Sequence, residues 1–278
     1  MKVAIQGEKA SFHDVAATQF FGKDIELICC ETFHETFAAL ADGRADHAVC
    51  AIENSLYGSI IETYDLLIKN DFVIIGEVYL RIEQCLIGMP GADVASIQEV
   101  YSHPVALAQC EEYLDTTLPK AERFEYHDTA ASVAKVRDLG DPTIAGIASS
   151  AAAKLYDMEV LAHSIETDKQ NYTRFIVIDK EHAAPERASK TSLMLVTTHN
   201  PGGLYRALGT FAHEMINLSK LESRPIIGNA WEYMFLVDID AGMQDERTKR
   251  ALEHLQFQNC KYTILGSYEA APKKPIAT

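Results

Sequence analysis

The sequence predicts an α/β protein of two domains, with a mostly parallel sheet covered by helices on both faces and then a smaller ferredoxin-like unit. Three observations support this prediction. A length of 278 residues suits two domains of ordinary size. The first 180 residues alternate short apolar runs with helical patterns, which is typical of a parallel sheet. After residue 190 the order of patterns becomes βαββαβ.

Short apolar or β-branched runs mark the strands of the N-terminal domain. They lie at residues 3–6, 25–30, 47–52, 72–82 and 143–148. Phe33, Phe37 and Leu40 recur at helical spacing between two of these runs. In a sheet of this kind, ligand sites lie at the carboxyl ends of the strands.

The C-terminal domain follows a linker at residues 181–190, which lacks apolar periodicity and contains Pro185. Its elements are expected in the order strand 192–198, helix 204–215, strands 218–222 and 231–240, helix 244–256 and strand 262–268. The tail at residues 270–278 is expected to be disordered.

The composition excludes several classes of partner. Acidic side chains number 40 and basic ones 25, so the net field repels polyanions, and we expect no nucleic acid. No apolar run approaches the ~20 residues that span a bilayer, and residues 1–7 lead into a strand without a signal sequence. We therefore expect a cytoplasmic protein without membrane contact.

Metal and cofactor motifs are missing from the sequence. The six cysteines form no CxxC pair, and the ten histidines are scattered, so we expect reduced thiols and no metal. Dinucleotide, P-loop, elbow-serine and zincin chemistries lose support because GxGxxG, GxxxxGK[ST], GxSxG and HExxH are all absent.

Short polar motifs stand where strands end and helices begin. Ser11, Pro104, Asp128 and Ser149 are each part of a helix-start signal. Several helix N-termini directed at one cleft would form an anion site in an otherwise acidic protein. Ser102 and His103 do not form a nucleophilic dyad, because adjacent residues of an extended segment face opposite sides.

Two further motifs carry groups that could contact a ligand. Glu53, Asn54 and Ser55 follow the third predicted strand. Thr173 and Arg174 begin an apolar strand, where the guanidinium could bind a carboxylate through two parallel hydrogen bonds. Each of these motifs alone could equally be a turn, a cap or a surface ion pair.

The series of motifs resembles the prephenate dehydratase family. The resemblance rests on a GxxxS[FY] turn, ENS, SHP with a downstream Gln, DTA, IASSAAA and NxTRF, in family order across residues 1–179. The region 191–269 resembles an ACT regulatory domain, with PGGLY at Pro201 and ESRP at Glu222. The implied fold is a bilobal, periplasmic-binding-protein-like catalytic domain at 1–180, whose chain crosses between lobes near 78–85 and 167–172.

The resemblance implies decarboxylating dehydration of prephenate to phenylpyruvate in L-phenylalanine biosynthesis. No cofactor is needed, because aromatisation of the ring drives the reaction. Thr173 would assist the departing hydroxyl and Arg174 would clamp a carboxylate. The remaining substrate contacts implied by the family are Ser11, Glu53, Asn54, Ser55, Thr129 and Ser149.

Feedback inhibition by L-phenylalanine is also implied, with the effector bound between two subunits of a homo-oligomer, a dimer or a dimer of dimers. The residues implied in this regulatory site are Asn200, Pro201, Gly202, Gly203, Leu204, Leu218, Ser219, Leu221, Glu222 and Ser223.

Two positions depart from the family pattern. Ala10 stands where the first motif usually has a second glycine, and Gly203 replaces the usual alanine, which we expect to loosen the helix start. Two other functions remain open from the sequence. One is dehydration of arogenate, the amino form of the substrate, and the other is a sensor that binds a small anion without turnover.

Overall fold

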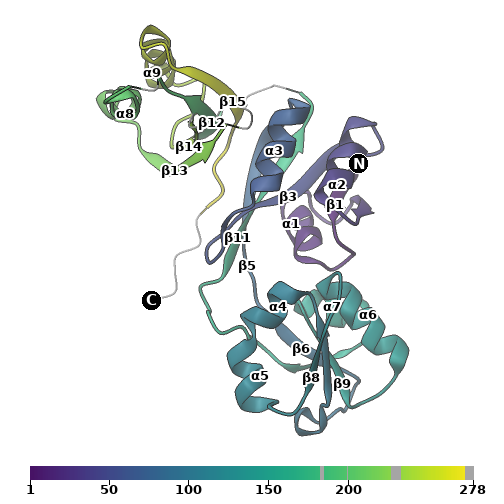
Figure 1. Cartoon of the computed structure of the whole chain (residues 1–278). Coiled ribbons are helices and arrows are strands. Elements are labelled where there is room, and N and C mark those ends of the chain that lie inside the picture. Colours follow the sequence, from purple (N-terminus) through teal and green to yellow (C-terminus); the bar gives the residue numbers. More distant parts are fainter. Residues whose placement is uncertain (182–184, 199, 227–232, 273–278) are drawn as a thin grey trace. The chain divides into compact units, whose positions relative to one another are not determined.

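The computed structural model describes residues 1–181, 185–198, 200–226 and 233–272 of the chain in Figure 1. These residues form two compact units. The first is made of Met1–Tyr64 and Val78–Phe175, and the second of Asp65–Glu77 and Ile176–Pro272. Residues 65–77 therefore group with the C-terminal part of the chain. None of the described helices is long and apolar enough to cross a membrane.

A six-stranded sheet has the order β2-β1-β3-β11-β5, with β4 paired to β3. Its strands are β1 (Lys2–Gln6), β2 (Glu26–Cys30), β3 (His47–Asn54), β4 (Gly58–Ser59), β5 (Val73–Arg81) and β11 (Tyr172–Asp179). β1 is parallel to both of its neighbours. The helices between these strands are α1 (Phe12–Phe21), α2 (Phe33–Ala41) and α3 (Ile61–Asn70).

A five-stranded sheet lies wholly within the first unit, in the order β10-β6-β9-β7-β8. Its strands are β6 (Cys85–Gly88), β7 (Glu99–Ser102), β8 (Glu122–Glu125), β9 (Ile144–Ala148) and β10 (Glu159–Ala162). The helices of this part are η1 (Val94–Ser96), α4 (Pro104–Gln109), α5 (Glu111–Thr117), α6 (Thr129–Leu139) and α7 (Ser150–Leu155). The chain passes between the two sheets at residues 82–84 and again at 163–171.

The second sheet is more mixed in direction than the sequence predicts. β7 is parallel to β8 and β9, as expected, but β6 is antiparallel to both β9 and β10. β6 enters this sheet from the other one, directly after residues 82–84, and it pairs only with strands that come much later in the chain.

The second unit contains a four-stranded antiparallel sheet in the order β13-β14-β12-β15. Its elements are β12 (Lys190–Val196), α8 (Gly203–His213), β13 (Leu218–Pro225), β14 (Tyr233–Ile239), α9 (Glu246–Phe257) and β15 (Lys261–Tyr268). This is the predicted order βαββαβ. Trp231, part of the third predicted strand of this domain, lies outside the described residues, as do residues 182–184 of the linker and 273–278 of the tail.

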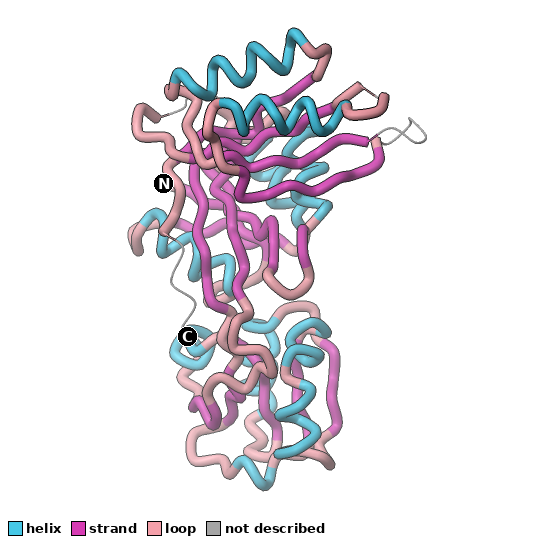
Figure 2. Tube along the Cα trace, turned by 90° about the vertical axis from the view of Figure 1, so that its left-hand side faces the viewer, coloured by secondary structure: helices cyan, strands magenta, loops and turns pink. Residues whose placement is uncertain are grey.

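Helices α8 and α9 cover one face of this sheet, and Figure 2 shows them side by side above its strands. The core between the two layers includes Leu193, Val237, Phe211 and Leu252, all almost fully buried. Burying an aliphatic or aromatic side chain of this size contributes about 1.5–3 kcal/mol. The apolar side chains that recur along α8 and α9 therefore determine which face of each helix packs against the sheet.

The predicted helix starts are confirmed. Ser11, Asp128 and Ser149 accept hydrogen bonds from the backbone amides of Asp14, Ala131 and Ala152. His103 caps α4, and Pro104 occupies its first turn. A cap is a local signal, and for that reason the sequence reveals it without knowledge of the tertiary structure.

Candidate active site

A cavity of about 640 Å³ lies in the first unit and is lined by strands of the six-stranded sheet and by helices that accompany both sheets. Its walls come from the ends of β1 and β3, the start of β11 and the first turns of α1, α2, α4 and α6. A binding site forms where these elements meet, because helix N-termini and strand ends have backbone groups that are free to bind a ligand.

Helix N-termini bring positive partial charge to the cavity, opposed by the carboxylates of Glu31, Glu62 and Asp128. Among the described lining residues there is no Lys or Arg. Ser11, Thr32 and Asp128, which cap α1, α2 and α6, all line the cavity. Each helix adds roughly half a positive charge at its N-terminus. The arrangement suits an anionic ligand even though the protein as a whole is acidic.

Gly7 allows the turn before α1 to lie close to Asp128, the residue that caps α6. Its φ is +91°, and a Cβ at this position would lie 2.7 Å from Asp128 Oδ2, whose partner oxygen caps α6. Any side chain at residue 7 would displace that carboxylate. The conformational freedom of glycine is therefore required here.

Thr173, on β11, is oriented by Asn54 from the end of β3. Asn54 Nδ2 donates to Thr173 Oγ1 at 3.0 Å and to Asn171 Oδ1 at 2.8 Å. Asn54 Oδ1 in turn accepts from the amides of Leu56 and Tyr57. Because Thr173 Oγ1 accepts from an amide, its own hydrogen is available to donate elsewhere. Thr173 is thus a positioned donor in the cavity wall.

A second pair of amides lies on the other side of the cavity. Gln84 Nε2 donates to Gln109 Oε1 at 3.1 Å, so that Gln109 Nε2 remains a donor for a ligand. Gln84 Oε1 and Asn171 Nδ2 are buried and have no hydrogen-bond partner among the described residues. Buried polar atoms without partners are uncommon and often face a ligand or water.

Aromatic and aliphatic side chains form the remaining wall. Phe12, Phe33, Phe175, Ile60 and Ile82 line the cavity beside these polar groups. This combination suits a ligand that has an apolar ring and anionic substituents.

Two cavity histidines have pKa values below the ordinary value. Desolvation lowers the pKa of His13 from 6.5 to about 3. Desolvation also lowers the pKa of His103, although the carboxylates of Asp128 and Glu125 oppose this shift. Both imidazoles are therefore largely neutral at physiological pH.

Four of the eight residues expected at the catalytic site line this cavity: Ser11, Asn54, Thr129 and Thr173. The other four do not. Ser149 Oγ donates to the Ala10 carbonyl, and Ser55 Oγ donates to the Gln170 carbonyl. Both hydroxyls join loops of the first unit.

Arg174 and Glu53 also lie away from the lining. Arg174 is almost fully buried, and its guanidinium is 3.7 Å from a carboxylate oxygen of Glu53. Successive side chains of a strand face opposite sides, so Thr173 and Phe175 face the cavity and Arg174 does not. In this conformation the guanidinium does not reach a ligand beside Thr173.

His13, Gln84 and Phe175 line the cavity but carried no functional signal in the sequence. Gln84 belongs to the short connection between the sheets, and His13 to the first turn of α1. Gln109 is the glutamine downstream of the SHP motif. Only the tertiary fold brings these residues together, and thus their spacing in the chain gives no signal.

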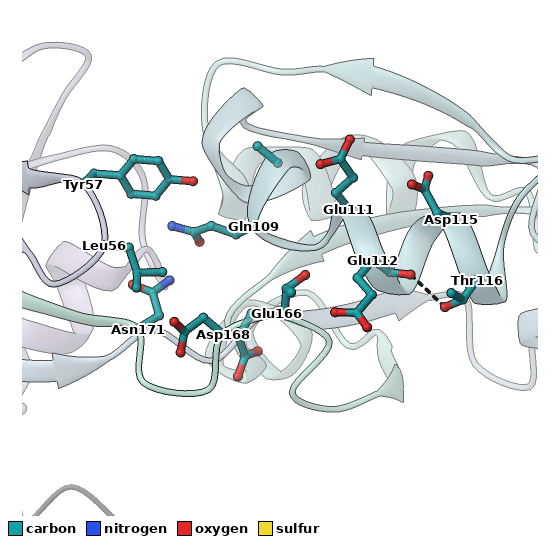
Figure 3. Close-up of a pocket in the computed structure, with 12 residues that line it drawn as sticks. Leu56, Tyr57, Gln109, Glu111, Glu112, Asp115, Thr116, Glu166, Asp168 and Asn171 are labelled. Atoms are coloured by element: carbon teal, nitrogen blue, oxygen red, sulfur yellow. Dashed lines mark hydrogen bonds between the residues drawn. The ribbon is translucent and has the colours of Figure 1, made fainter.

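An acidic hollow of about 550 Å³ adjoins this cavity and shares Tyr57 and Gln109 with it. Figure 3 shows Glu111, Glu112 and Asp115 along α5, with Glu166 and Asp168 from the segment before β11. Its carboxylates disfavour an anionic ligand. The helix N-termini of the neighbouring cavity are more favourable for such a ligand than this hollow.

One cluster among the described residues brings three potential metal ligands together: Glu83, Cys85 and His163. Both carboxylate oxygens of Glu83 already have partners, since Ser164 Oγ donates to one at 2.7 Å and Arg81 lies 3.7 Å from the other. Burial raises the pKa of Cys85 to about 11, which opposes the thiolate that a metal needs. The cluster does not line the cavity.

The second unit has a hollow of its own, of about 530 Å³, beside the start of α8. Asn200, Pro201 and Leu204 line it, together with Phe235 of β14. The regulatory residues expected at 218–223 lie on β13, an edge strand of the sheet. They do not line this hollow.

Gly203 does not merely loosen the start of α8. A Cβ at this position would lie 2.4 Å from the Thr198 carbonyl oxygen. The chain before α8 passes so close to the helix that an alanine could not be accommodated without movement of the backbone. The expectation that Gly203 loosens the helix start stays a prediction, and the close approach adds a tertiary reason for glycine that helix propensity does not reveal.

Comparison with known proteins identifies the family of the chain. The family model for prephenate dehydratase matches residues 3–183. A bifunctional chorismate mutase/prephenate dehydratase of Aquifex aeolicus (strain VF5) is 36% identical over 271 residues, which cover 98% of this chain and 74% of the relative.

Solved structures give the same fold. Prephenate dehydratase from Arthrobacter aurescens, in complex with L-Phe, has a TM-score of 0.87 and 31% identity, covering 100% of this chain and 92% of that one. GqqA, described as a novel type of quorum quenching acylase, has a TM-score of 0.87 and 33% identity, covering 98% and 99%. The extent of the family match and of these similarities establishes that the chain belongs to the prephenate dehydratase family.

Proposed function

We propose that the cavity binds prephenate and converts it to phenylpyruvate, with Thr173 as the donor to the departing hydroxyl. The bond between the ring and its carboxylate breaks, and the electron pair enters the ring. The hydroxyl at the opposite ring carbon then leaves and is protonated to water. The observation that carries the proposal is the bond from Asn54 Nδ2 to Thr173 Oγ1, which leaves the threonine hydrogen available for the substrate.

Thr173 acts as a hydrogen-bond donor rather than as a strong acid, because an alcohol has a pKa far above neutrality. A positioned donor or acid of this kind contributes typically about 10²–10⁴-fold to the rate. Asn54 would position the threonine, and Gln109 Nε2 offers a second donor across the cavity. Aromatisation of the ring supplies the remaining driving force, and no cofactor is required.

The two carboxylates of the substrate are proposed to lie at the N-termini of α1, α2 and α6, with Ser11 and Thr129 as polar contacts. The ring would pack against Phe33 and Phe175. For Arg174, Glu53, Ser55 and Ser149 we propose support of this frame, since their side chains contact the segments that carry the cavity residues. Arg174 would clamp a carboxylate only after a change of side-chain conformation.

Regulation by L-phenylalanine is proposed for the second unit, as an ACT-type domain at residues 191–269. The hollow at Asn200, Pro201 and Leu204 would take the amino acid at the start of α8, whose N-terminus favours its carboxylate. Leu218, Ser219, Leu221, Glu222 and Ser223 would contribute from β13 of a second subunit in a dimer or tetramer. The catalytic domain at 1–180 would be bilobal, like a periplasmic binding protein.

Alternative functions differ in their chemical requirements. Arogenate carries an ammonium in place of the keto oxygen, so both substrates have the same ring, hydroxyl and carboxylates. An acylase needs an activated nucleophile. Among the described residues that line the cavity, no hydroxyl or thiol is hydrogen-bonded to a histidine, so this reaction lacks support.

The test is phenylpyruvate formation from prephenate by the purified chain, followed by ultraviolet absorbance, with and without L-phenylalanine. Thr173→Val keeps the shape of the side chain without its hydroxyl and should lower kcat by about 10²–10⁴-fold. Thr173→Ser keeps the donor and should retain most activity. If Thr173→Val turned over as fast as the unmodified chain, the assignment of Thr173 would be wrong. If the chain turned over arogenate but not prephenate, arogenate would be its substrate. If it bound prephenate or arogenate but converted neither, it would be a sensor.

A further inference from the structure

His13 has a defined tautomer because of one backbone contact. The amide of Ala51 donates to His13 Nε2 at 3.2 Å. A nitrogen that accepts a hydrogen bond carries no hydrogen. The hydrogen of the neutral ring must therefore be on Nδ1.

The surroundings of the ring keep it neutral. The imidazole packs edge-on against Phe33 and Phe175, with ring centroids 5.7 Å and 5.0 Å away. It also lies in the first turn of α1, where the helix dipole opposes a positive charge. Glu31, Glu62 and Asp128 line the same cavity, but desolvation outweighs them and lowers the pKa of His13.

Nδ1 faces no partner within the described part of the chain. No hydrogen bond is formed by this atom, and it is not among the buried polar atoms that are sealed without a partner. His13 itself lines the cavity. Its N–H group is thus a donor that a bound ligand can reach.

The position of His13 relative to Thr173 indicates which part of the substrate it meets. His13 contacts Phe175, which follows Thr173 by two residues on the same face of β11. Two residues along a strand span about 6.6 Å. Thr173 and the Phe175 ring that His13 contacts are therefore offset along the strand by about the length of a six-membered ring with its substituents.

We propose that His13 Nδ1–H donates a hydrogen bond to the ring carboxylate that departs as carbon dioxide. The proposal rests on the function proposed above. A carboxylate loses its negative charge as it becomes carbon dioxide, so a cation would stabilise the ground state more than the transition state. A neutral donor orients the carboxylate with a smaller penalty of this kind. The lack of Lys and Arg in the described lining agrees with such a site.

Three substitutions of His13 distinguish the role of the Nδ1–H donor from that of the Nε2 contact with the Ala51 amide. His13→Asn places an amide nitrogen near the position of Nδ1 but does not reach the Ala51 amide. His13→Gln places its amide near Nε2, and so keeps that contact but removes the donor at Nδ1. His13→Phe keeps the ring and loses both hydrogen bonds.

We expect His13→Asn to keep kcat/KM for prephenate within about fivefold, and His13→Gln and His13→Phe to lose about 10–100-fold, as for one hydrogen bond to a charged group. Inhibition by phenylpyruvate, which lacks the ring carboxylate, should be the same in all variants. The kcat profile between pH 5.5 and 8 should be the same for the unmodified chain and His13→Asn.

A structural role predicts the opposite order, with His13→Gln active and His13→Asn inactive, and that order would overturn the proposal. Equal activity or equal loss in all three variants would also overturn it. The same holds if kcat of the unmodified chain falls at acidic pH and this fall is absent in His13→Asn. Binding of prephenate is measured alongside the rates. A chain that binds prephenate without turnover contradicts the proposed function, while the order of affinities still tests the donor.

Discussion

Ala10 adopts a backbone conformation that side chains rarely take. Its φ is +65°, and it stands where the family pattern has glycine. The turn is nevertheless well connected, because the Ala10 amide donates to Asp14 Oδ2 at 2.7 Å and its carbonyl accepts from Ser149 Oγ at 2.9 Å. The left-handed conformation costs a non-glycine residue roughly 1–2 kcal/mol.

We expect Ala10→Gly to raise the free energy of unfolding by roughly 0.5–1 kcal/mol, since relief of strain exceeds the greater entropy of the unfolded chain. Chemical denaturation of the full chain measures this change. Ala16→Gly is the matched control, because Ala16 is buried within α1 and its replacement should destabilise the protein. A lower stability of Ala10→Gly would show that the turn is not strained.

His13 should make the stability of the protein sensitive to acid. The pKa of its side chain is about 3 in the folded state and about 6.5 in the unfolded state, so the unfolded state binds more protons between these values. The contribution is fully present above pH 6.5 and is lost as the pH falls towards 3.

Between pH 6.5 and 5.5, the unmodified chain should lose up to about 1 kcal/mol more stability than His13→Phe, which cannot be protonated. Urea denaturation at the two pH values gives the difference. Equal losses in both proteins would mean that the imidazole protonates as readily in the folded state as in the unfolded one.

Roles that depend on local contacts can be predicted from the sequence, whereas roles that depend on tertiary contacts cannot. Ser11, Asp128 and Ser149 were identified as caps because capping involves only the next few residues. Arg174 was expected beside Thr173, although the alternation of a strand already predicts that neighbours face opposite sides. The cavity role of His13 depends on contacts with β3 and β11, which no local pattern reveals.

At the scale of elements, the long strands were predicted well and the short ones were not. No strand is predicted from the sequence for β6, β7, β8 or β10, each of four residues, because runs of that length carry no clear period. β12 to β15 were predicted within a few residues, since each is a longer run bounded by turns.

A buried ion pair joins β5 to β12 within the second unit. Lys190 Nζ lies 2.8 Å and 3.1 Å from the two carboxylate oxygens of Glu77, and both side chains are almost fully buried. The backbone of β5 also approaches β15 closely, because a Cβ on Gly266 of β15 would lie 2.1 Å from the Ile74 carbonyl oxygen of β5. The first part of β5, up to Glu77, therefore contacts the four-stranded sheet.

Glu77→Leu should lower the free energy of unfolding by about 3–5 kcal/mol, because it leaves the Lys190 ammonium buried without its main counter-ion. The double substitution with Lys190→Met should recover most of this loss. Denaturation of the single and double variants provides the test. If Glu77→Leu alone had the stability of the unmodified chain, the pair would contribute nothing beyond its packing.

For the whole molecule, helix α3 links the proposed active site to the proposed regulatory site. Glu62, in its first turn, lines the cavity. Asp65, one turn later, forms a bidentate ion pair with Arg224 of β13, with distances of 2.8 Å and 3.3 Å. Arg224 follows directly after the residues expected to bind the effector. Because α3 includes residues of both units, we expect the ion pair of Asp65 with Arg224 to contribute to the coupling between the two sites.

Arg224→Gln should therefore weaken inhibition by L-phenylalanine without a comparable loss of its binding. Coupling between two sites usually amounts to about 1–3 kcal/mol, which corresponds to roughly 5–150-fold in apparent affinity. Calorimetry measures effector binding, and the phenylpyruvate assay measures inhibition on the same samples. Arg247→Gln is the control, since its pair with Asp245 lies on the surface at the start of α9. Loss of binding in Arg224→Gln would place Arg224 in the effector site itself, whereas unchanged inhibition would show that the effect of phenylalanine does not pass through α3.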